Sequence, residues 1–312
     1  MFLMIKHIVR AQDFDEGFLM DLFSEADEMR RLIKSGNRST LRKTLEGNIM
    51  ATLFYEPSTR TRMSFEAAMY RLGGNVISTE NASEFSSAVK GETLEDTIRV
   101  VSGYVDVIVI RHYDDEVDKG AVDISRVPII NAGSGQGQHP TQTLLDLYTI
   151  NDILGGLQGI KIAMVGDLKR GRTVKSLSYV LGGKFNGTEI YFVSPENSKM
   201  SDNIKDYLNR KKVKWEETSN LNEVLPLVDC VYMTRIQKER FDNEEEYNKA
   251  KGQFVMDNSN IGFMKDNAIL LHPLPKINEI NPEINTNKRS KYFEQAENGL
   301  YVRMALLKHV LS

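Results

Sequence analysis

The spacing of apolar residues changes along this chain and predicts where its helices and strands lie. Between Asp13 and Ile33, apolar residues recur every three or four positions, which is the pattern of an amphipathic helix, and Gly36 ends it. Short apolar runs then alternate with helical patterns. The first series of predicted strands covers residues 48–56, 74–80, 105–111 and 127–133, with helices that begin near Ser58 and Glu92.

A second series of strands and helices follows in the other half of the chain. Its predicted strands cover residues 160–167, 188–195, 213–218, 229–235 and 268–274, and its clearest helices cover residues 173–183 and 203–212. Apolar strands that alternate with helices indicate parallel sheets with helices on both faces. Residues 139–156 form a long helical pattern without a strand of its own, and residues 292–312 form a last amphipathic helix.

These patterns predict an α/β fold of two doubly wound parallel-sheet domains. The helix at residues 139–156 would connect the domains, and the C-terminal helix would pack back on the first of them. The expected first domain is 1–140 plus 293–312, and the expected second domain is 141–292. A length of 312 residues suits two domains of ordinary size.

Composition and charge narrow the classes of protein that fit. The formal net charge is −3 and no long block of like charge occurs, which argues against nucleic acid as a partner. Cys230 is the only cysteine, so the sequence excludes an intramolecular disulfide and a metal site built from several cysteines. Lys6 and Arg10 interrupt the apolar N-terminus, and no stretch reaches eighteen apolar residues. We therefore expect a soluble cytoplasmic protein without a membrane partner.

The stretch from Ser58 to Arg62, "STRTR", combines three hydroxyl groups and two guanidinium groups at a predicted helix start. Serine and threonine are favoured N-caps, which would explain one hydroxyl group. Capping would not explain Arg60 and Arg62, because cations are unfavourable at the positive end of a helix dipole. We therefore expect an anion to bind at this helix start.

Other predicted strands also end in cations or hydrogen-bond donors. Ligands of parallel sheets bind beyond the carboxyl ends of the strands, which makes these positions the candidate site. They are Arg111 and His112, His139 and Gln142, Arg172 and Thr173, Arg235 and Gln237, and His272. A lone arginine such as Arg111 or Arg235 would more often be solvated, and His272 suits a turn. Together they predict a site for anions.

Three other segments bear on alternative functions. The sequences "GSGQG" and "MVGDLKRGR" lack the glycine spacing of dinucleotide sites and the lysine pattern of nucleoside triphosphate sites, which disfavours both functions. Lys90 lies in a segment without helix or strand periodicity, directly before Gly91. It is either a solvated loop lysine or a lysine on an arm that reaches an anion, even one bound by another subunit.

Taken in order along the chain, these motifs resemble the catalytic chains of aspartate carbamoyltransferases. The similar stretches are "STRTR", "KGETLEDT", "YVDVIVIRH", "NAGSGQGQHPTQTLLDLYTI", "MVGDLKRGRTVKSL", "MTRIQKERF" and "HPLP". The motif "STRTR" is common to carbamoyltransferases in general. The aspartate enzymes are favoured by "HPTQ", by Lys90 before "GETL", and by "HPLP", because related ornithine enzymes have "HPCQ" and "HCLP" at these places.

The resemblance implies transfer of a carbamoyl group from carbamoyl phosphate to L-aspartate, for de novo pyrimidine biosynthesis, in a cleft between the domains. The first domain would bind carbamoyl phosphate and the second would bind aspartate. By this resemblance the carbamoyl phosphate-binding residues are Ser58, Thr59, Arg60, Thr61, Ser86, Lys90, Arg111, His139 and Gln142. The catalytic residues among these are Arg60, Thr61, Lys90, Arg111, His139 and Gln142. The aspartate-binding residues are Lys90, Arg172, Thr173, Arg235, Gln237 and Leu274.

The resemblance also implies a mechanism and an assembly. Thr61, Arg111 and His139 would stabilise the negative charge that develops on the carbonyl oxygen, and Gln142 would hold the carbamoyl amino group. No side chain suggests a general base, so the departing phosphate would accept the proton, and neither cofactor nor metal is expected. The implied homotrimer shares its sites through Ser86 and Lys90, and whether regulatory chains join it stays open.

Three points remain for experiment or structure to decide. Arg62 is expected to support the fold by pairing with a nearby carboxylate. A carbamoyltransferase with another acceptor is the alternative enzyme, although a cationic acceptor would need a carboxylate where the second half offers Arg172 and Arg235. A non-catalytic anion-binding protein is the alternative from another class, and an activity assay separates it from the enzymes.

Overall fold

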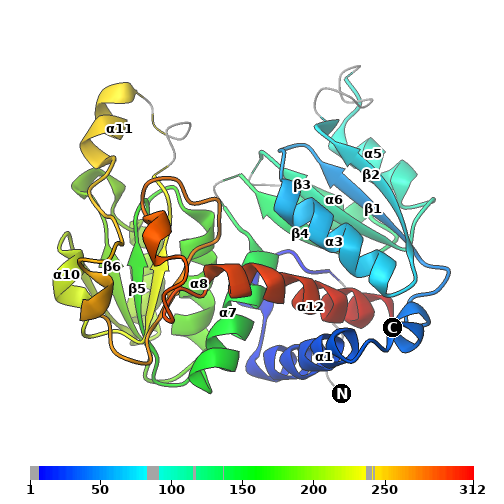
Figure 1. The fold of residues 1–312 in the computed structure, drawn as a ribbon. Coiled ribbons are helices and arrows are strands. Elements are labelled where there is room, and N and C mark those ends of the chain that lie inside the picture. The colour runs from blue at the N-terminus through cyan, green and yellow to red at the C-terminus, as the bar shows by residue number, and fades with distance from the viewer. Residues whose placement is uncertain (1–6, 83–90, 115–116, 136, 237–240, 242) are drawn as a thin grey trace. The chain divides into compact units, whose positions relative to one another are not determined.

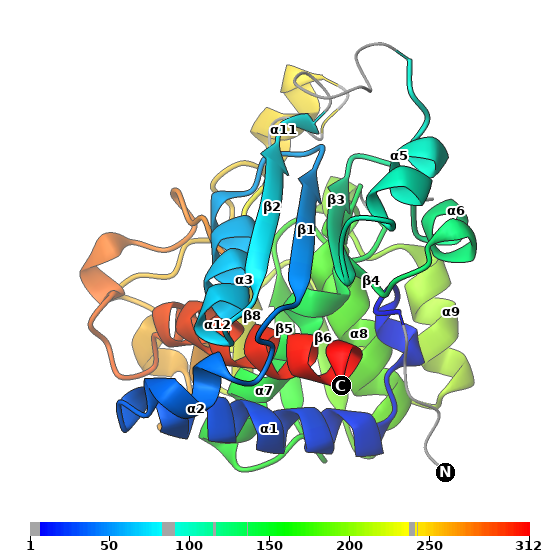
Figure 2. The same ribbon diagram turned by 90° about the vertical axis from the view of Figure 1, so that its right-hand side faces the viewer.

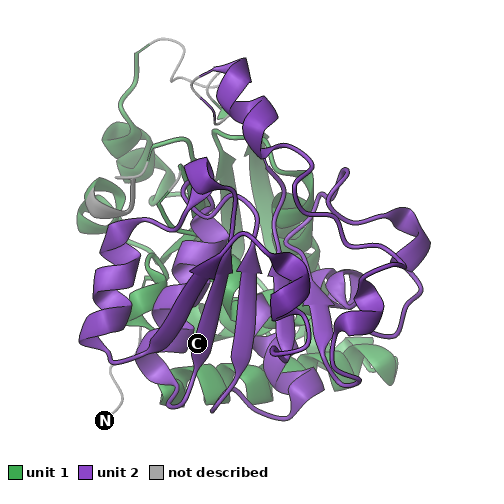
Figure 3. Ribbon diagram, turned by 90° about the vertical axis from the view of Figure 1, so that its left-hand side faces the viewer, with its two compact units in different colours: residues 1–144, 298–312 green, residues 145–297 purple. Residues whose placement is uncertain are grey.

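The chain forms two compact units, each built around a parallel sheet (Figures 1 and 3). The structure is a computed structural model that describes residues 7–82, 91–114, 117–135, 137–236, 241 and 243–312, with backbone alone at 117–119. Unit 1 comprises residues 1–144 and 298–312, and unit 2 comprises residues 145–297. The chain passes between units within helix α7 (Pro140–Leu154) and within helix α12 (Tyr292–Leu311).

Unit 1 contains a four-stranded sheet in the order β2-β1-β3-β4. Its strands are β1 (Ile49–Phe54), β2 (Asn75–Glu80), β3 (Val107–His112) and β4 (Ile129–Ser134). All neighbouring strands are parallel, and the register places Phe54 of β1 beside Arg111 of β3. The carboxyl ends of β1, β3 and β4 therefore lie next to one another at one edge of the sheet.

Helices cover both faces of this sheet. On one face, Ile98 of α5 (Leu94–Val101) and Ala121 of α6 (Val117–Ile124) pack against Leu53 and its neighbours in the core. Helix α3 (Thr59–Arg71) covers the opposite face and buries Phe65 completely (Figures 1 and 2). Burial on both faces explains why β1, β3 and β4 are almost continuously apolar.

The C-terminal helix packs back on unit 1, as predicted. Its His309 ring lies 5.1 Å from the Phe18 ring of α1 (Glu16–Lys34), and Lys308 forms a 2.8 Å ion pair with Glu25. The guanidinium group of Arg303 lies 5.1 Å from the centre of the Phe65 ring. Residues 298–312 therefore complete the core that α1 and α3 begin.

Unit 2 contains a five-stranded parallel sheet in the order β7-β6-β5-β8-β9. Its strands are β5 (Lys161–Val165), β6 (Glu189–Val193), β7 (Lys214–Thr218), β8 (Cys230–Met233) and β9 (Ile269–Leu271). Helices α8 (Arg172–Lys184) and α9 (Asp202–Arg210) pack together beside β6 and β7. A second apolar cluster forms where Val165 and Val193 pack with the residues that follow β7 and β8. The order brings the carboxyl ends of β5, β8 and β9 together.

All nine predicted strands are present, and the described helices that the apolar pattern did not predict are short. These helices are η1 (Ala11–Asp13), α2 (Arg38–Arg42), α6, η3 (Glu196–Ser198), α10 (Leu221–Val224), α11 (Glu244–Ala250), η5 (Ile261–Phe263) and η6 (Pro282–Ile284). Each has eight residues or fewer, so it spans too few turns to show a clear helical period. Within the described part of the chain, no helix is long and apolar enough to span a bilayer.

Arg62 supports the fold of unit 1 by pairing with carboxylates, which confirms the expectation for this residue. Its guanidinium group lies 3.1 Å from the carboxylate of Glu66, one turn on in α3, and 2.7 Å from that of Glu80 in β2. It also donates a hydrogen bond to Ser78. Arg62 thus joins α3 to the edge strand of the sheet.

We expect Arg62→Met to destabilise the protein by about 1–3 kcal/mol, because Glu66 would stay largely buried without its cation. Chemical denaturation of the variant and of the wild type measures this loss. Arg71→Met is the matched control, because Arg71 lies in the same helix and is exposed. Equal stability of the two variants would contradict the structural role of Arg62.

Candidate active site

The helix start after β1 is built to accept an anion. Ser58 occupies the N-cap position of α3, its side chain makes no capping hydrogen bond, and the first turn contains no acidic residue. Thr59 and Arg60 are exposed, whereas Thr61 is buried. The first backbone N–H groups of a helix lack partners within the helix, so a helix start of this kind can bind an anion.

Arg111 ends the neighbouring strand β3 and is held in a fixed position. Its guanidinium group donates a 2.6 Å hydrogen bond to Glu56, which follows β1, and a longer bond of 3.5 Å to the carbonyl oxygen of Ala132 in β4. The backbone adds to this, because Tyr55 N–H donates to the Arg111 carbonyl oxygen at 2.8 Å. The side chain is only 9% exposed. Arg111 therefore presents a preorganised cation at the sheet edge.

The loop after β4 presents His139 and Gln142. Asn131 shapes the loop, because its side chain accepts a 2.8 Å hydrogen bond from Gly133 N–H and donates a 3.0 Å bond to Ser134. The loop closes where Ser134 N–H donates to the Gln138 carbonyl oxygen. His139 and Gln142 follow at the start of α7, and both are buried.

Three adjacent strands of unit 1 thus end in predicted site residues. The α3 start follows β1, Arg111 ends β3, and His139 follows β4. These groups are hydrogen-bond donors and cations, so the edge can bind a dianion and also stabilise charge on a carbonyl oxygen nearby.

Unit 2 repeats this arrangement with a second helix start. Gly171 is the N-cap of α8, where it makes no side-chain capping bond, and the first turn again lacks an acidic residue. Arg172 is buried in that turn, next to Thr173. By contrast, α1 and α5 are capped by Asp15 and Thr93 and carry acidic residues in their first turns. The α3 and α8 starts therefore share features that those capped helices lack.

Arg235 lies beyond β8, which is next to β5, and Leu274 lies beyond β9, which is next to β8. Gly166 directly follows β5 and has φ +116°, and a side chain there would place its Cβ 2.3 Å from the carbonyl oxygen of Thr234. Glycine is required by this close approach, which sets the residue before Arg235 directly against the β5 turn. Leu274 follows β9 and has φ +48°. Arg172, Arg235 and Leu274 thus come from three adjacent strand ends.

Ser86, Lys90 and Gln237 lie outside the described residues, so their predicted roles stay predictions. Among the residues that the structure does describe, no group of three or more His, Cys, Asp or Glu side chains could hold a metal ion.

Comparisons with known proteins agree with this division of the site. Residues 6–152 match the family description "Aspartate/ornithine carbamoyltransferase, carbamoyl-P binding domain", and residues 158–310 match "Aspartate/ornithine carbamoyltransferase, Asp/Orn binding domain". The chain belongs to the aspartate/ornithine carbamoyltransferase family. The two family domains together span almost the whole chain.

Individual members of the carbamoyltransferase family are similar over almost the whole of this chain. The chain is 52% identical over 308 residues to chloroplastic aspartate carbamoyltransferase of Arabidopsis thaliana, covering 98% of this chain and 78% of that protein. It is 47% identical over 307 residues to the aspartate carbamoyltransferase catalytic subunit of Methanocaldococcus jannaschii, covering 98% of each. A crystal structure of aspartate transcarbamoylase from Trypanosoma cruzi, in complex with carbamoyl phosphate and aspartate, matches with a TM-score of 0.91 and 38% identity, covering 98% of this chain and 97% of that one.

His272 has a structural role in this carbamoyltransferase chain, as its place in "HPLP" predicted. Its Nδ1 accepts a 2.8 Å hydrogen bond from Leu274 N–H, so the ring proton lies on Nε2, which donates to Glu279 at 2.9 Å. Burial lowers the pKa of His272, although Glu279 opposes the shift. Burial alone would raise the pKa of Glu279, but its hydrogen bond with His272 and neighbouring N–H groups lower it overall. A neutral histidine therefore holds Leu274 in place.

We expect the free energy of unfolding to fall as the pH is lowered below about 6.5, the pKa of an unfolded histidine. The folded pKa of His272 is lower, so the unfolded chain binds more protons in that range. Denaturation at several pH values between about 5 and 7 should show a smaller slope for His272→Gln than for the wild type.

His309→Gln serves as the control for this pH prediction, because burial also lowers the pKa of His309, which lies in α12 far along the chain from "HPLP". In His309→Gln, the free energy of unfolding should still show the part of its pH dependence that comes from His272. An unchanged slope in His272→Gln would contradict the assignment.

Arg170 is a second buried arginine in the loop before α8, and it binds protein groups. Its guanidinium group stacks over the Phe241 ring at 4.0 Å and lies within 3.7 Å of Asp167 and 3.6 Å of Glu246. These contacts tie the loop of Arg172 to the segment that follows Arg235 and to α11.

Glu56 is the site residue that the sequence prediction omitted. It directly precedes Pro57 at the end of a predicted strand, where a carboxylate is unexpected in a site for anions. The sequence does place Glu56 and Arg111 at the ends of two predicted strands. Their pairing could not be predicted, because it depends on β1 and β3 being neighbours in the sheet. Glu56 fixes Arg111 and thereby contributes to the site indirectly.

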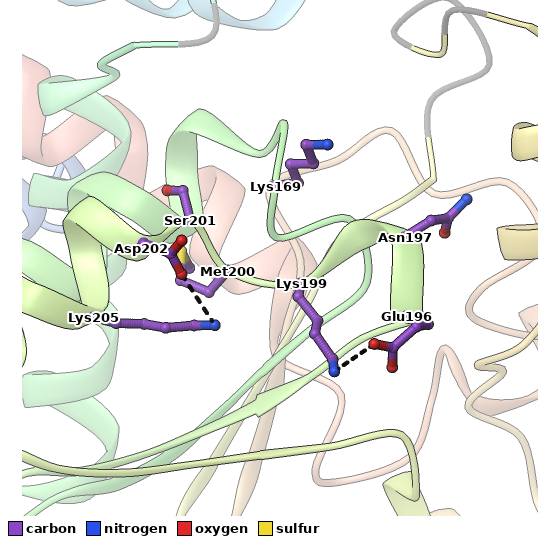
Figure 4. A pocket seen from close by; sticks show the side chains of 8 residues that line it. All are labelled: Lys169, Glu196, Asn197, Lys199, Met200, Ser201, Asp202 and Lys205. Atoms are coloured by element: carbon purple, nitrogen blue, oxygen red, sulfur yellow. Dashed lines mark hydrogen bonds and ion pairs between the residues drawn. The ribbon is translucent and has the colours of Figure 1, made fainter.

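An open pocket of about 420 Å³ lies beside the α9 start and contains none of the predicted site residues (Figure 4). Its lysines are partly neutralised by carboxylates, because Lys199 pairs with Glu196 at 2.7 Å and Lys205 pairs with Glu217 at 2.7 Å. The strand-end residues are therefore the stronger candidate for chemistry in this carbamoyltransferase.

Proposed function

We propose that this chain transfers the carbamoyl group of carbamoyl phosphate to the amino group of L-aspartate and releases phosphate. The observation that carries the proposal is that two helices that follow strands, α3 after β1 in unit 1 and α8 after β5 in unit 2, begin without a side-chain cap or an acidic residue and carry arginine in the first turn. Each can hold an anion, and both substrates of this reaction are anions. The Trypanosoma cruzi relative, whose structure contains both molecules, supports the same pair of substrates.

We assign carbamoyl phosphate to unit 1. Its phosphate would bind the α3 start through Ser58, Thr59, Arg60 and Thr61, with Ser86 and Lys90 assisting. Its carbonyl oxygen would accept hydrogen bonds from Thr61, Arg111 and His139, and Gln142 would hold its amino group. Donors that are already in place stabilise the developing oxyanion without reorganisation. Glu56 holds Arg111 in place, so we expect Arg111 to contribute most to this stabilisation.

We assign L-aspartate to unit 2, with Lys90 of unit 1 assisting. Its two carboxylates would bind Arg172 and Arg235, because the planar guanidinium group matches a carboxylate in two parallel hydrogen bonds. Gln237 would assist these arginines, and Thr173 and the backbone carbonyl group of Leu274 would also contact aspartate. Binding both substrates with the aspartate nitrogen next to the carbonyl carbon would account for much of the rate enhancement through orientation alone.

The reaction forms a C–N bond and breaks the C–O bond to phosphate. The aspartate nitrogen attacks the carbonyl carbon, the phosphate departs with the electron pair of the C–O bond, and it accepts the proton that the nitrogen loses. A pH profile of transfer that follows the titration of the substrates would agree with this route. A profile that follows a carboxylate of the protein would contradict it.

The deciding experiment measures carbamoyl transfer from carbamoyl phosphate to L-aspartate and to L-ornithine side by side. We expect transfer to aspartate alone, and we expect Arg235→Ala to abolish it while the chain still binds carbamoyl phosphate. Transfer to ornithine would show that the acceptor assignment is wrong. If neither amino acid is carbamoylated while carbamoyl phosphate still binds, the phosphate-site assignment would be retained and the acceptor assignment would be rejected.

We further propose a homotrimer in the cytoplasm, in which Ser86 and Lys90 of one chain complete the site of its neighbour. The single cysteine, Cys230, is buried and suits a reducing compartment. Mixing the inactive variants Lys90→Ala and Arg60→Ala tests the shared site, because hybrid trimers would regain some intact sites. A mixture that forms hybrids and stays inactive would contradict the proposal.

A further inference from the structure

A buried carboxylate in unit 2, Asp146 of α7, joins two segments that were assigned to the acceptor. It is fully buried. Its Oδ2 accepts a hydrogen bond from the Tyr232 hydroxyl group at 2.7 Å, and its Oδ1 accepts one from the Gln295 side-chain amide at 2.6 Å. A buried carboxylate is costly unless donors surround it, so this position requires the two partners.

The Tyr232 contact leads to the start of α8. Tyr232 lies in β8 and is fully buried, and the Thr173 side chain lies near enough to its hydroxyl group to lower its pKa in part. Burial and the Asp146 carboxylate raise the pKa of Tyr232 overall, so the phenol keeps its proton and donates a hydrogen bond to Asp146. Thr173 is adjacent to Arg172 in the first turn of α8. This first arm therefore fixes the position of the α8 start relative to Asp146.

The Gln295 contact leads to the segment after β9. The amide oxygen of Gln295 accepts a 2.9 Å hydrogen bond from His272 N–H, and the His272 ring in turn accepts one from Leu274 N–H. Because Gln295 donates to Asp146 with its nitrogen, its oxygen must face His272, which fixes the orientation of the amide. This second arm fixes the backbone at Leu274, whose φ of +48° is unfavourable without such support.

We propose that Asp146 is a positioning residue for the acceptor site. Its carboxylate holds the α8 start, through Tyr232, and the 272–274 segment, through Gln295, at the spacing that aspartate requires. The inference rests on the proposed function, because aspartate is the molecule that these two segments would bind. Asp146 itself is buried and acts only through its neighbours.

The test compares full-length Tyr232→Phe with wild type, because this variant removes one oxygen atom and one arm. We expect its KM for L-aspartate to rise about ten-fold, the change that corresponds to loss of one hydrogen bond to a charged group. We expect kcat to change less than about three-fold and the dissociation constant of carbamoyl phosphate to stay the same, because the phosphate site lies in unit 1.

Tyr191→Phe is the matched control. Tyr191 lies in β6 of the same sheet, is nearly buried, and its hydroxyl group donates only a long 3.4 Å bond to Glu189. It has no connection to Asp146, Thr173 or Leu274 through any of the hydrogen bonds described above. Its KM for aspartate should match that of the wild type, and thermal melting of both variants separates a loss of stability from a loss of position.

Asp146→Asn, alone and combined with Tyr232→Phe, tests whether the carboxylate acts through the tyrosine. We expect the second substitution to add much less than it costs alone, because both remove the same arm. Fully additive effects would overturn the proposal, and so would a KM in Tyr232→Phe no higher than in Tyr191→Phe. If Asp146→Asn fails to fold, the comparison of the two tyrosine variants decides.

The proposed function and this inference fail in distinguishable ways. A wild-type chain that carbamoylates no aspartate would overturn both. A wild-type chain that carbamoylates aspartate, with an unchanged KM in Tyr232→Phe, would overturn the positioning role and leave the proposed function intact.

Discussion

Arg111→Met is expected to slow carbamoyl transfer about a thousand-fold, the upper end of what one oxyanion donor supplies. In the proposed mechanism Arg111 contacts both the phosphate and the carbonyl oxygen of carbamoyl phosphate. The charge on that oxygen grows as the aspartate nitrogen attacks, so the loss should appear mainly in kcat. Methionine keeps most of the length of the side chain and removes only its donors and its charge. Steady-state rates with both substrates varied provide the measurement.

The control for Arg111 is Glu56→Gln. Glu56 anchors Arg111 at 2.6 Å, and its side chain keeps 32% of its surface exposed, so water can solvate Glu56 after Arg111 is changed. Glutamine still offers an oxygen to the guanidinium group, and we expect a loss of less than about ten-fold in kcat. A similar loss in both variants would show that the pair acts through structure. Retention of near wild-type kcat in Arg111→Met would remove Arg111 from the mechanism.

Arg172→Lys is expected to raise the KM for L-aspartate about a hundred-fold while carbamoyl phosphate still binds normally. Lysine keeps the positive charge but cannot form two parallel hydrogen bonds with a carboxylate. Arg172 is 5% exposed at the start of α8, so an ammonium group there would also lose water without gaining an equivalent partner. Measurements of kcat and KM at saturating carbamoyl phosphate provide the test.

Arg170→Lys is the matched control for Arg172→Lys. Both arginines are buried, Arg170 in the loop before α8 and Arg172 in the first turn of α8, and Arg170 stacks on Phe241 and pairs with Asp167 and Glu246. We expect a lower melting temperature and a KM for aspartate within about five-fold of wild type, because a lysine ammonium loses the stacked geometry. Equal increases in KM would show that the whole loop, rather than Arg172 itself, determines acceptor binding.

The order of elements and the chemistry at the strand ends could be predicted from the sequence. The strands follow from short apolar runs and the long helices from an apolar period of about 3.6 residues, and both are local features of the sequence. Residues such as Arg111 and Arg172 could be assigned to positions beyond strand ends, because a charged residue that follows an apolar run marks the point where the buried strand ends. The short helices such as α10 could not be predicted, because fewer than two turns carry no period.

Pairings between distant segments could not be predicted. The Glu66 partner of Arg62 is four residues away on one helix, so a local rule suggests it, but Glu80 becomes a partner only when β2 lies beside β1. Glu56 and Arg111 likewise meet because β1 and β3 are neighbours. Asp146 lies within an apolar helix pattern, where nothing in the sequence indicates that Tyr232 and Gln295 will surround it.

The sequence by itself thus determined the α/β class, the anion-binding character and the family resemblance of this protein. The tertiary structure alone decided which strands are adjacent, which carboxylate anchors which cation, and which tautomer His272 adopts. The physical reason is the distance along the sequence over which each effect acts. Backbone preference and apolar spacing act over a few residues, whereas the strand order depends on how crossover helices pack against the sheet. A buried hydrogen bond forms only after that packing has removed water from both partners.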